Sequence, residues 1–531
     1  MNLDGISYLD LGDSFARHDW ANALNAWWSP VYPWILGIVV NLVKPSPRFE
    51  FPLVHIVNFF MFLATLAAFR FFLHRLIKFC SEPRESDPGT SPLPEWSLIL
   101  LGYAIFLWTS LEVVSIYGVG PDLMVMLCIC LLGGALLGLR QNPSLRRFVF
   151  FGLVLGIGYW VKTILLPLGV FSLLCSYFWK PSSRSWRIGI ATAALVFLCV
   201  TTPLILLLSK QKGRFTIGET GRLNYARYVF PRMSWSNWQG EIPGGGKPVH
   251  PTRQIMTHPP VFEFDGPVPG TYPPWTDPSY WNEGVHPRFR LKPQLQVLAE
   301  TIPSEVRILL REQPDLVVGV IVFALLGGQL WWAGLRKLWS LVAICLVGMA
   351  AYVPLVVNDR YLGGFVLLLF LAILAAVRLR PADQRCAAYV AVAVFITMTL
   401  STLDLTVRYV THHLVNSGAG PNSTMEDLAA AEQLIHSGTR PGDKVAVVSD
   451  DGPGIYWARL AKLRIVAEVG RGGATENFWD LPDERKHRVY DALATARARL
   501  VVARCPAKTV EGWEQISGTS TCVFWLQKNV D

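Results

Sequence analysis

Two acidic and two basic residues stand where apolar segments of this chain begin, end or break: Asp4, Asp122, Lys162 and Arg360. A carboxylate can take a proton from a hydroxyl group and so act as a general base. An Arg guanidinium can hold a phosphate through paired hydrogen bonds, and a Lys ammonium can stabilise one as a point charge. If the fold brings these side chains together, they suit transfer of a group from a phosphate to an acceptor hydroxyl.

Each of the four also has a purely structural interpretation. An ionisable side chain at a membrane boundary can simply extend to water along its own apolar stem. Asp4 and Asp122 could each cap the helix that follows, and Lys162 could be an interfacial anchor. The sequence leaves these alternatives open.

The composition is that of an integral membrane protein. Of 531 residues, 52% are hydrophobic and 16% charged, whereas soluble domains average about 25% charged residues. The net charge of +9 could indicate nucleic-acid binding, but the basic residues flank apolar runs and are not interleaved with aromatic residues. We therefore expect a lipid bilayer, and no nucleic acid, among the partners.

Apolar runs of about 20 residues, the length that crosses a bilayer, predict eight spans: near 51–73, 96–114, 118–139, 188–208, 314–335, 338–357, 361–378 and 386–408. The run 148–179 is too short for two more full spans, and basic residues flank it on both sides. It is predicted to form two short, broken helices whose bend places Lys162 near the outer face. The segment 30–44 is predicted to lie in the membrane interface.

Basic clusters set the predicted orientation: they occur at 70–84, 140–147, 180–187, 336–337 and 378–385. If all five are cytoplasmic, the positive-inside rule holds throughout. The predicted organisation is then an external catalytic loop with juxtamembrane helices (1–50), membrane helices (51–209), an external Pro/Trp-rich loop (210–313), membrane helices (314–410) and an external domain (423–531).

The tail 423–531 alternates short apolar strands with helical segments. "KVAVVSD", "LRIVAEVG", "RLVVARC" and "CVFWLQ" are predicted strands, and "MEDLAAAEQLI" and "ERKHRVYDALATA" are predicted helices. This pattern predicts a small α/β domain with a mainly parallel sheet. Cys505 and Cys522 lie in it, and an oxidising compartment would permit a disulfide between them. Two free thiols in the core are an equal alternative.

The loop 210–313 is rich in Pro and carries "WSNW" and "GTYPPWTDPSYW". A loop this long inside a membrane domain is usually functional. Its Trp and Tyr rings offer flat apolar faces with polar edges. Such rings suit contact with sugars, and they also suit packing on a membrane surface; both interpretations stay open.

The segment "DGISYLDLGDSFARHDWANALNAWWSPVYPWIL" resembles the first external loop of the GT-C superfamily of glycosyltransferases, which includes protein O-mannosyltransferases and the aminoarabinose transferases of lipid A. Members show an acidic residue, a juxtamembrane helix and a "P-L-Y-P"-like motif. The corresponding features here are Asp4, Tyr8–Asp19 and "SPVYP" at Ser29–Pro33. "PDLM", "GIGYWVKT" and "DRYL" resemble later motifs of the family in the same order, so the resemblance covers about residues 1–410.

This resemblance implies roles for particular residues. Asp4 is the expected catalytic base, and Asp122 is the second acidic catalytic residue. The residues expected to hold the polyprenyl phosphate of the donor are Lys162, Arg360 and Tyr361. The residues expected to contact substrate are Tyr8, Trp28 and Tyr32.

One departure from the family concerns a possible metal. Many relatives have an Asp-Glu pair, whereas Gly5 follows Asp4 here. The role of the second acid must then come from Asp122, Asp10 or Asp13, or be absent. A divalent metal is possible, no cofactor is certain, and no residue is assigned as a metal ligand.

The resemblance implies a mainly α-helical polytopic membrane protein of GT-C type, with the C-terminal α/β domain added. Its expected function is transfer of a sugar, with inversion, from a polyprenyl-phosphate donor to a hydroxyl of a lipid, glycan or protein at the outer face of a plasma (inner) membrane. One alternative is a transporter or flippase of lipid-linked sugars, which would carry mid-membrane charges and repeated halves. The other is a catalytically silent membrane scaffold.

In relatives a first membrane helix precedes the acidic loop, but this sequence starts within the loop. We expect the natural start to lie upstream of such a helix. The alternative is that Asp4 reaches the outer face without its own anchor.

Overall fold

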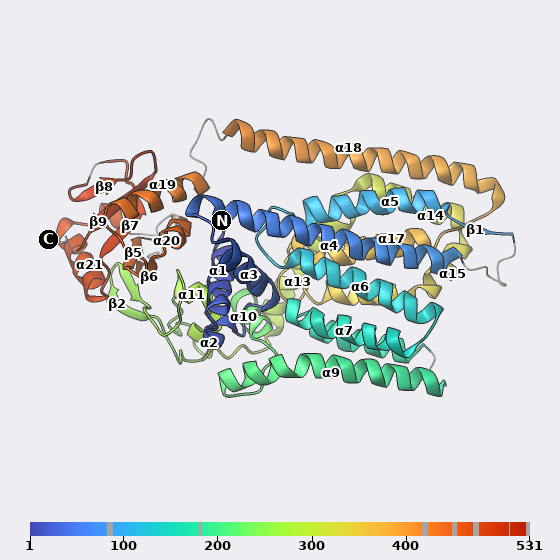
Figure 1. Cartoon of the computed structure of the whole chain (residues 1–531), viewed down its shortest axis with the longest axis horizontal. Coiled ribbons are helices and arrows are strands. Elements are labelled where there is room, and N and C mark those ends of the chain that lie inside the picture. Colours follow the sequence, from blue (N-terminus) through green and yellow to red (C-terminus); the bar gives the residue numbers. More distant parts are fainter. Residues whose placement is uncertain are drawn as a thin grey trace. The chain divides into compact units, whose positions relative to one another are not determined.

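Two units make up the computed structural model of this chain, one of packed apolar helices and one built around a β-sheet (Figure 1). The helical unit comprises Ile56–Gly218 and Phe289–Thr411, and the sheet unit comprises Met1–His55, Glu219–Arg288 and His412–Asp531. The structure describes residues 1–81, 89–179, 183–416, 423–448, 454–470, 477–508 and 510–526. Arg84 and Lys180, used above for orientation, lie outside these ranges.

The long apolar helices of the helical unit are α4 (Pro47–Ser81), α5 (Glu95–Trp108) with a π-helix (Thr109–Val113), α6 (Asp122–Gln141), α9 (Arg184–Lys212) and α18 (Gln384–Asn416). Within the described ranges, these five are long and apolar enough to cross a membrane. A bent pair, α14 (Pro314–Gly327) and α15 (Gln329–Lys337), adds a sixth span if it counts as one. The chain is therefore a multi-pass membrane protein, as predicted.

Two of the predicted membrane spans differ from the helices in the structure. The predicted span 314–335 is bent by 108° between α14 and α15, where Gly328 has a positive φ of 51°. The predicted span 338–357 contains α16 (Trp339–Ala350), which has only 12 residues. At 1.5 Å per residue, such a helix reaches about 18 Å and cannot cross a hydrocarbon core of about 30 Å. The prediction of a full span there is wrong.

The break predicted at Lys162 is present. α7 (Leu145–Val161) ends one residue before Lys162, whose backbone is extended, and α8 (Leu165–Tyr177) begins three residues after it. Pro167 favours the break, because a proline ring clashes with the carbonyl four residues earlier, here that of Thr163, and fits best in the first turn of a helix.

α6 and α17 (Asp359–Ala375) are the most enclosed helices of this unit, and α6, α7 and α9 lie side by side (Figure 1). A Cβ atom added at Gly364 of α17 would lie 3.1 Å from Cα of Met126 and 2.9 Å from Cδ1 of Ile129 in α6. The two helices therefore touch near their N-terminal ends. This contact brings the first turns of both helices, and the charges on them, close together.

The sheet unit contains one seven-stranded sheet: β2 (Arg253–Thr257), β3 (Pro260–Glu263), β6 (Arg464–Val469), β5 (Lys444–Val448), β7 (Leu500–Arg504), β9 (Thr521–Trp525) and β8 (Trp513–Gln515), in this spatial order. The four strands predicted in the tail are confirmed as β5, β6, β7 and β9. Only the β6–β5–β7 pairings are parallel, so the prediction of a mainly parallel sheet is wrong. The reason is that antiparallel strands add to both edges.

The predicted loop 210–313 is not a separate part of the chain. Its β2–β3 hairpin joins the tail's sheet through β6, and its short helices α10 (Thr220–Tyr228), α11 (Pro273–Thr276) and α12 (Pro278–Trp281) belong to the same unit. Its last part forms α13 (Leu291–Leu310), which belongs to the helical unit. The β2–β3 hairpin is far from β6 in the sequence, so no local sequence pattern could predict that β3 pairs with β6.

Alternating residues of the central strands supply two cores, one on each face of the sheet. Val445 and Val447 pack with α19 (Ser423–His436) and α20 (Tyr456–Leu460), together with Ile6 of α1 (Leu3–Ala16). Ala446 and Val448 pack with α21 (Asp483–Thr495). This arrangement follows from the two-residue period of a strand, and it confirms the predicted α/β domain.

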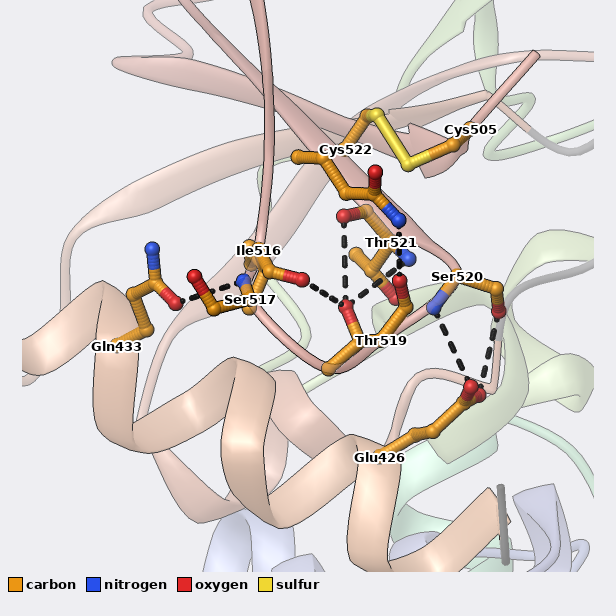
Figure 2. Close-up of a disulfide and its surroundings, with 10 residues drawn as sticks. Glu426, Gln433, Cys505, Ile516, Ser517, Thr519, Ser520, Thr521 and Cys522 are labelled. Carbon is orange, nitrogen blue, oxygen red and sulfur yellow. Dashed lines mark hydrogen bonds between the residues drawn. A yellow bond between two sulfur atoms is a disulfide. The ribbon is translucent and has the colours of Figure 1, made fainter. Parts of the chain in front are cut away.

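A disulfide joins Cys505 to Cys522, with their Cα atoms 5.0 Å apart, across the ends of β7 and β9 (Figure 2). The alternative of two free thiols is therefore wrong. The turn that precedes Cys522 is also held by α19, because Glu426 accepts hydrogen bonds from Ser520 and Gln433 accepts one from the backbone of Ser517.

α1 packs directly on α3 (Val31–Val43) through two glycines. A Cβ atom at Gly37 would lie 2.2 Å from the carbonyl oxygen of Gly12. The thirteen residues of α3 are too few to span a bilayer, in agreement with the prediction that segment 30–44 does not cross. The position of α1, which carries Asp4, thus depends on a backbone contact that no side chain can enter.

We predict that Gly37→Ala destabilises the protein by about 2 kcal/mol, because the added methyl group collides with backbone that cannot rotate away. For a unit of this size, this corresponds to a fall in Tm of roughly 4–8 °C, measurable by thermal unfolding in detergent. Gly221→Ala is the matched control, since nothing lies within 4 Å of its added Cβ atom. Equal Tm values for the two variants would contradict the proposed packing constraint.

Candidate active site

Three of the charged residues singled out from the sequence meet in the helical unit. The Lys162 Nζ atom lies 2.6 Å from Oδ1 of Asp122. The Arg360 Nε atom lies 3.5 Å from the other carboxylate oxygen, Oδ2. One acid thus contacts two cations that come from separate segments of the chain.

Three helix ends produce this arrangement. Asp122 is the first residue of α6, Lys162 follows the last residue of α7, and Arg360 is the second residue of α17. The cap before α6 is Pro121, so Asp122 is not the N-cap, and its carboxylate is engaged by the two cations. Asn358 caps α17 by accepting a hydrogen bond from the backbone N–H of Arg360.

Two tyrosines complete this cluster. The Lys162 Nζ atom lies 3.9 Å from the ring centre of Tyr361, and the guanidinium of Arg360 lies 5.3 Å from the same centre. Tyr361 stacks on Tyr352 with ring centres 5.2 Å apart. Tyr352 is buried, and its hydroxyl has no hydrogen-bond partner among the described residues. The sequence prediction missed Tyr352, although it lies nine positions before Tyr361.

Burial differs between the acid and the cations. The Asp122 side chain is 8% exposed, whereas Lys162 and Arg360 are 21% and 27% exposed. In these contacts two cations face one carboxylate, and both cations retain open surface. This arrangement favours an anion, and the positive ends of the α6 and α17 dipoles favour one too. The neighbouring Asp359 does not join it and pairs with Arg307 instead, 3.8 Å away.

Asp4 lies in the sheet unit, in the first turn of α1. The N-cap of this helix is Asn2, whose side chain accepts a hydrogen bond from the backbone of Gly5. The interpretation of Asp4 as a helix cap is therefore wrong. The Asp4 Oδ1 atom accepts a hydrogen bond of 3.2 Å from Nε1 of Trp275, which fixes the direction of the carboxylate.

Arg227 of α10 lies among the indole rings around Asp4. Its guanidinium carbon lies 4.6 Å from the ring centre of Trp27, 4.8 Å from that of Trp235 and 5.8 Å from that of Trp275. Burial lowers the pKa of Arg227 to about 10, while the nearby charges of Tyr228 and Asp4 act in the opposite direction. The side chain is therefore still a cation at neutral pH. The sequence prediction missed this cluster, although "WSNW" and "GTYPPWTDPSYW" contain two of its indoles.

The three residues expected to contact substrate pack against one another. The ring centre of Tyr8 lies 4.9 Å from that of Trp28 and 5.2 Å from that of Tyr32, both edge to face. Tyr8 and Tyr32 are buried, at 6% and 1% exposure. The Trp28 indole donates a hydrogen bond to the carbonyl of Thr276. This geometry fits a support for α1 better than a surface that receives substrate.

A buried ion cluster holds the other end of α1. Arg459 of α20, 9% exposed, pairs with Asp10, Asp13 and Glu50. Asp10 also accepts hydrogen bonds from the backbone and side chain of Thr271. Burial raises the pKa of Asp10, while Arg459 and Thr271 act against that rise. Asp10 and Asp13 are therefore engaged in fixing α1 to the sheet unit.

We predict that Arg459→Met destabilises the protein by about 3–5 kcal/mol, because removing one partner leaves buried carboxylates unpaired. Without the cation, these carboxylates bind protons more tightly in the folded state than in the unfolded state. The stability lost in the variant should therefore return as the pH is lowered from 8 toward 5. Thermal unfolding across this pH range measures it.

Arg253→Met is the control, because Arg253 is 70% exposed and pairs with Glu263 at the surface. Such pairs contribute about 0–1 kcal/mol. If Arg459→Met and Arg253→Met unfold at the same temperature at every pH, Arg459 does not hold α1.

Within the described part of the chain, no group of three or more His, Cys, Asp or Glu side chains is arranged to hold a metal ion. No metal ligand had been assigned from the sequence.

Among solved structures, the chain is similar to ArnT from Cupriavidus metallidurans in the apo state, with a TM-score of 0.52 and 11% sequence identity, over 98% of this chain and 93% of that one. It also matches ArnT from the same organism bound to undecaprenyl phosphate, with a TM-score of 0.38 and 10% identity, over 100% of this chain and 94% of that one. No protein-family model and no curated protein matches it. The chain therefore shares the fold of ArnT, in agreement with the fold expected from its sequence motifs.

Proposed function

We propose that the protein is a GT-C-type glycosyltransferase that moves a sugar from a polyprenyl-phosphate donor to an acceptor hydroxyl. The observation that carries the proposal is the Asp122–Lys162–Arg360 cluster, in which two partly exposed cations share one buried acid. The fold that this chain shares with ArnT also supports the proposal. A lipid donor fits a chain whose cations stand at the ends of apolar helices.

In the proposed reaction, Lys162 and Arg360 bind the phosphate of the donor. The acceptor oxygen forms a bond to the anomeric carbon while the bond from that carbon to the phosphate oxygen breaks. Negative charge then grows on the phosphate, and the two cations stabilise it more strongly in the transition state than in the ground state. A single displacement of this kind inverts the anomeric configuration.

Asp4 is the proposed base, and it takes the proton of the acceptor hydroxyl as the new bond forms. The hydrogen bond from Trp275 to Oδ1 fixes the direction of the Asp4 carboxylate, as proton transfer to it requires. Asp122 is less suited to accept a proton, because both of its oxygens face cations. We assign Asp122 to positioning Lys162 and Arg360, and Tyr361 to supporting the same two cations.

The proposal places the reaction at the outer face of the plasma (inner) membrane. The basic clusters of the sequence support this orientation through the positive-inside rule, and the Cys505–Cys522 disulfide supports an oxidising compartment for the sheet unit. Lipid-linked donors suit that side, where nucleotide sugars are not generally present.

We predict that Lys162→Met weakens binding of polyprenyl phosphate roughly tenfold to a hundredfold, the effect of losing one hydrogen bond to a charged group. Binding is measured with the full chain in nanodiscs. Arg307→Met is the control, because Arg307 is a half-exposed cation of the same unit that pairs elsewhere.

The double variant Asp122→Asn/Lys162→Met separates binding from folding, because it removes the buried acid together with the nearer of its two cations, and Arg360 is partly exposed to water. It should melt like the parent and still bind weakly. Parent-like affinity in both Lys162 variants would exclude Lys162 from the phosphate site.

We predict that Asp4→Asn abolishes sugar transfer and leaves donor binding unchanged, because the amide cannot accept the proton but still accepts the Trp275 hydrogen bond. Loss of labelled sugar from a panel of polyprenyl-phosphate donors measures transfer. Asp19→Asn is the control, an acid of the same segment whose side chain contacts Asn22. Transfer by Asp4→Asn at the parent's rate would eliminate Asp4 as the base.

A further inference from the structure

Trp235 presents an indole ring to solvent close to Asp4. It is 42% exposed, and it stacks on Trp275 with ring centres 5.4 Å apart and planes inclined by 27°. Trp275 in turn donates the hydrogen bond to Asp4. One ring stack and one hydrogen bond thus connect an exposed aromatic face to the proposed base. We refer to Trp235 and Trp275 as the indole pair.

The exposed ring is held in place from several directions. Arg227 donates a hydrogen bond of 3.0 Å to the carbonyl of Trp235 and also contacts its ring. The ring of Tyr228 meets that of Trp235 edge to face at 5.4 Å. A large apolar ring kept at the surface in a fixed position forgoes burial that would otherwise stabilise it. A preformed ring of this kind is a feature of binding sites.

The positive charge of Arg227 limits which ligands can bind to the indole pair. Arg227 is 5% exposed, and its Nε and Nη1 atoms have no hydrogen-bond partner among the described residues. Its positive charge lies close to both indole rings. The ammonium group of a choline or ethanolamine lipid headgroup is cationic, so this charge disfavours its stacking on the indole rings. A neutral or anionic ligand is favoured.

A pyranose ring matches this surface. One side of such a ring carries C–H groups that fit the electron-rich face of an indole, and its hydroxyls lie around the rim, where they can reach polar groups. A ring stacked on Trp235 would also bring a carbohydrate close to the residue proposed to take a proton from the acceptor.

We propose that the indole pair is a carbohydrate-binding platform and that the acceptor of the reaction is a neutral or anionic glycan or glycolipid. This inference rests on the proposed function, because it names the acceptor of the same reaction. Arg227 is a positioning residue, since it holds the indoles without a need to touch the sugar.

The test is equilibrium binding of fluorescent soluble probes to the full chain in nanodiscs made without sugar-based detergents, which would compete for the platform. The probes are neutral hexose oligosaccharides, uronic-acid oligosaccharides and Ser/Thr-containing peptides. The proteins are the parent, Trp235→Ala and Trp235→Phe. Trp20→Ala is the matched control, because Trp20 is 52% exposed in the same unit but contacts Phe15 and Trp34 instead.

We expect the parent to bind at least one oligosaccharide class. Trp235→Ala should lose about tenfold or more in affinity, as for a Trp that anchors a ligand, whereas Trp235→Phe keeps an aromatic face and should lose less. Trp20→Ala should bind as the parent does.

Three outcomes would overturn the proposal: no oligosaccharide binding by the parent, equal effects of Trp235→Ala and Trp20→Ala, or binding of peptides in place of glycans through Trp235. The second outcome is also what packing of Trp235 on a membrane surface would produce. Because the assay needs no donor, it separates the two claims. Glycan binding through Trp235 with no sugar transfer from any donor would refute the proposed function and the role of the glycan as acceptor.

Discussion

The pairing of buried Asp122 with Lys162 and Arg360 is the interaction on which the rest of the helical unit depends. A carboxylate at the end of an apolar helix is costly unless cations approach it. Two cations can do so only because α7 breaks before Lys162 and because α17 begins beside the N-terminal turns of α6. The broken helix and the glycine contact are therefore conditions for this pairing, in which Lys162 and Arg360 stay partly exposed.

In the sheet unit, the main contacts hold one short helix, α1, in place. α1 is fixed by the glycine contact with α3, by the Arg459 ion cluster and by the aromatic packing of Tyr8. Its first turn is then held by the Trp275 hydrogen bond. A proposed base must keep a constant direction, and these contacts keep it fixed. The same unit adds the indole pair, so the base and the proposed acceptor surface share one rigid support.

Local patterns explain what the sequence could predict. The break at Lys162, the four main strands of the tail and the GT-C character of the fold all follow from periodicity, span length and the order of short motifs. The contacts that complete the candidate site are of another kind. Trp275 and Asp4 are 271 positions apart, and Arg459 and Asp10 are 449 apart. No local signal joins such residues, and the β2–β3 hairpin likewise finds its partner strand only in the folded chain. The charged residues of the candidate site could be predicted from the sequence, whereas the long-range contacts that hold them in place could not.

The most direct test of the account is an experimental structure of the full chain in a nanodisc with polyprenyl phosphate bound. The account predicts that the phosphate oxygens lie within hydrogen-bond distance, about 2.7–2.9 Å, of the Lys162 ammonium and the Arg360 guanidinium. A phosphate bound at another place, out of reach of Lys162 and Arg360, would contradict it.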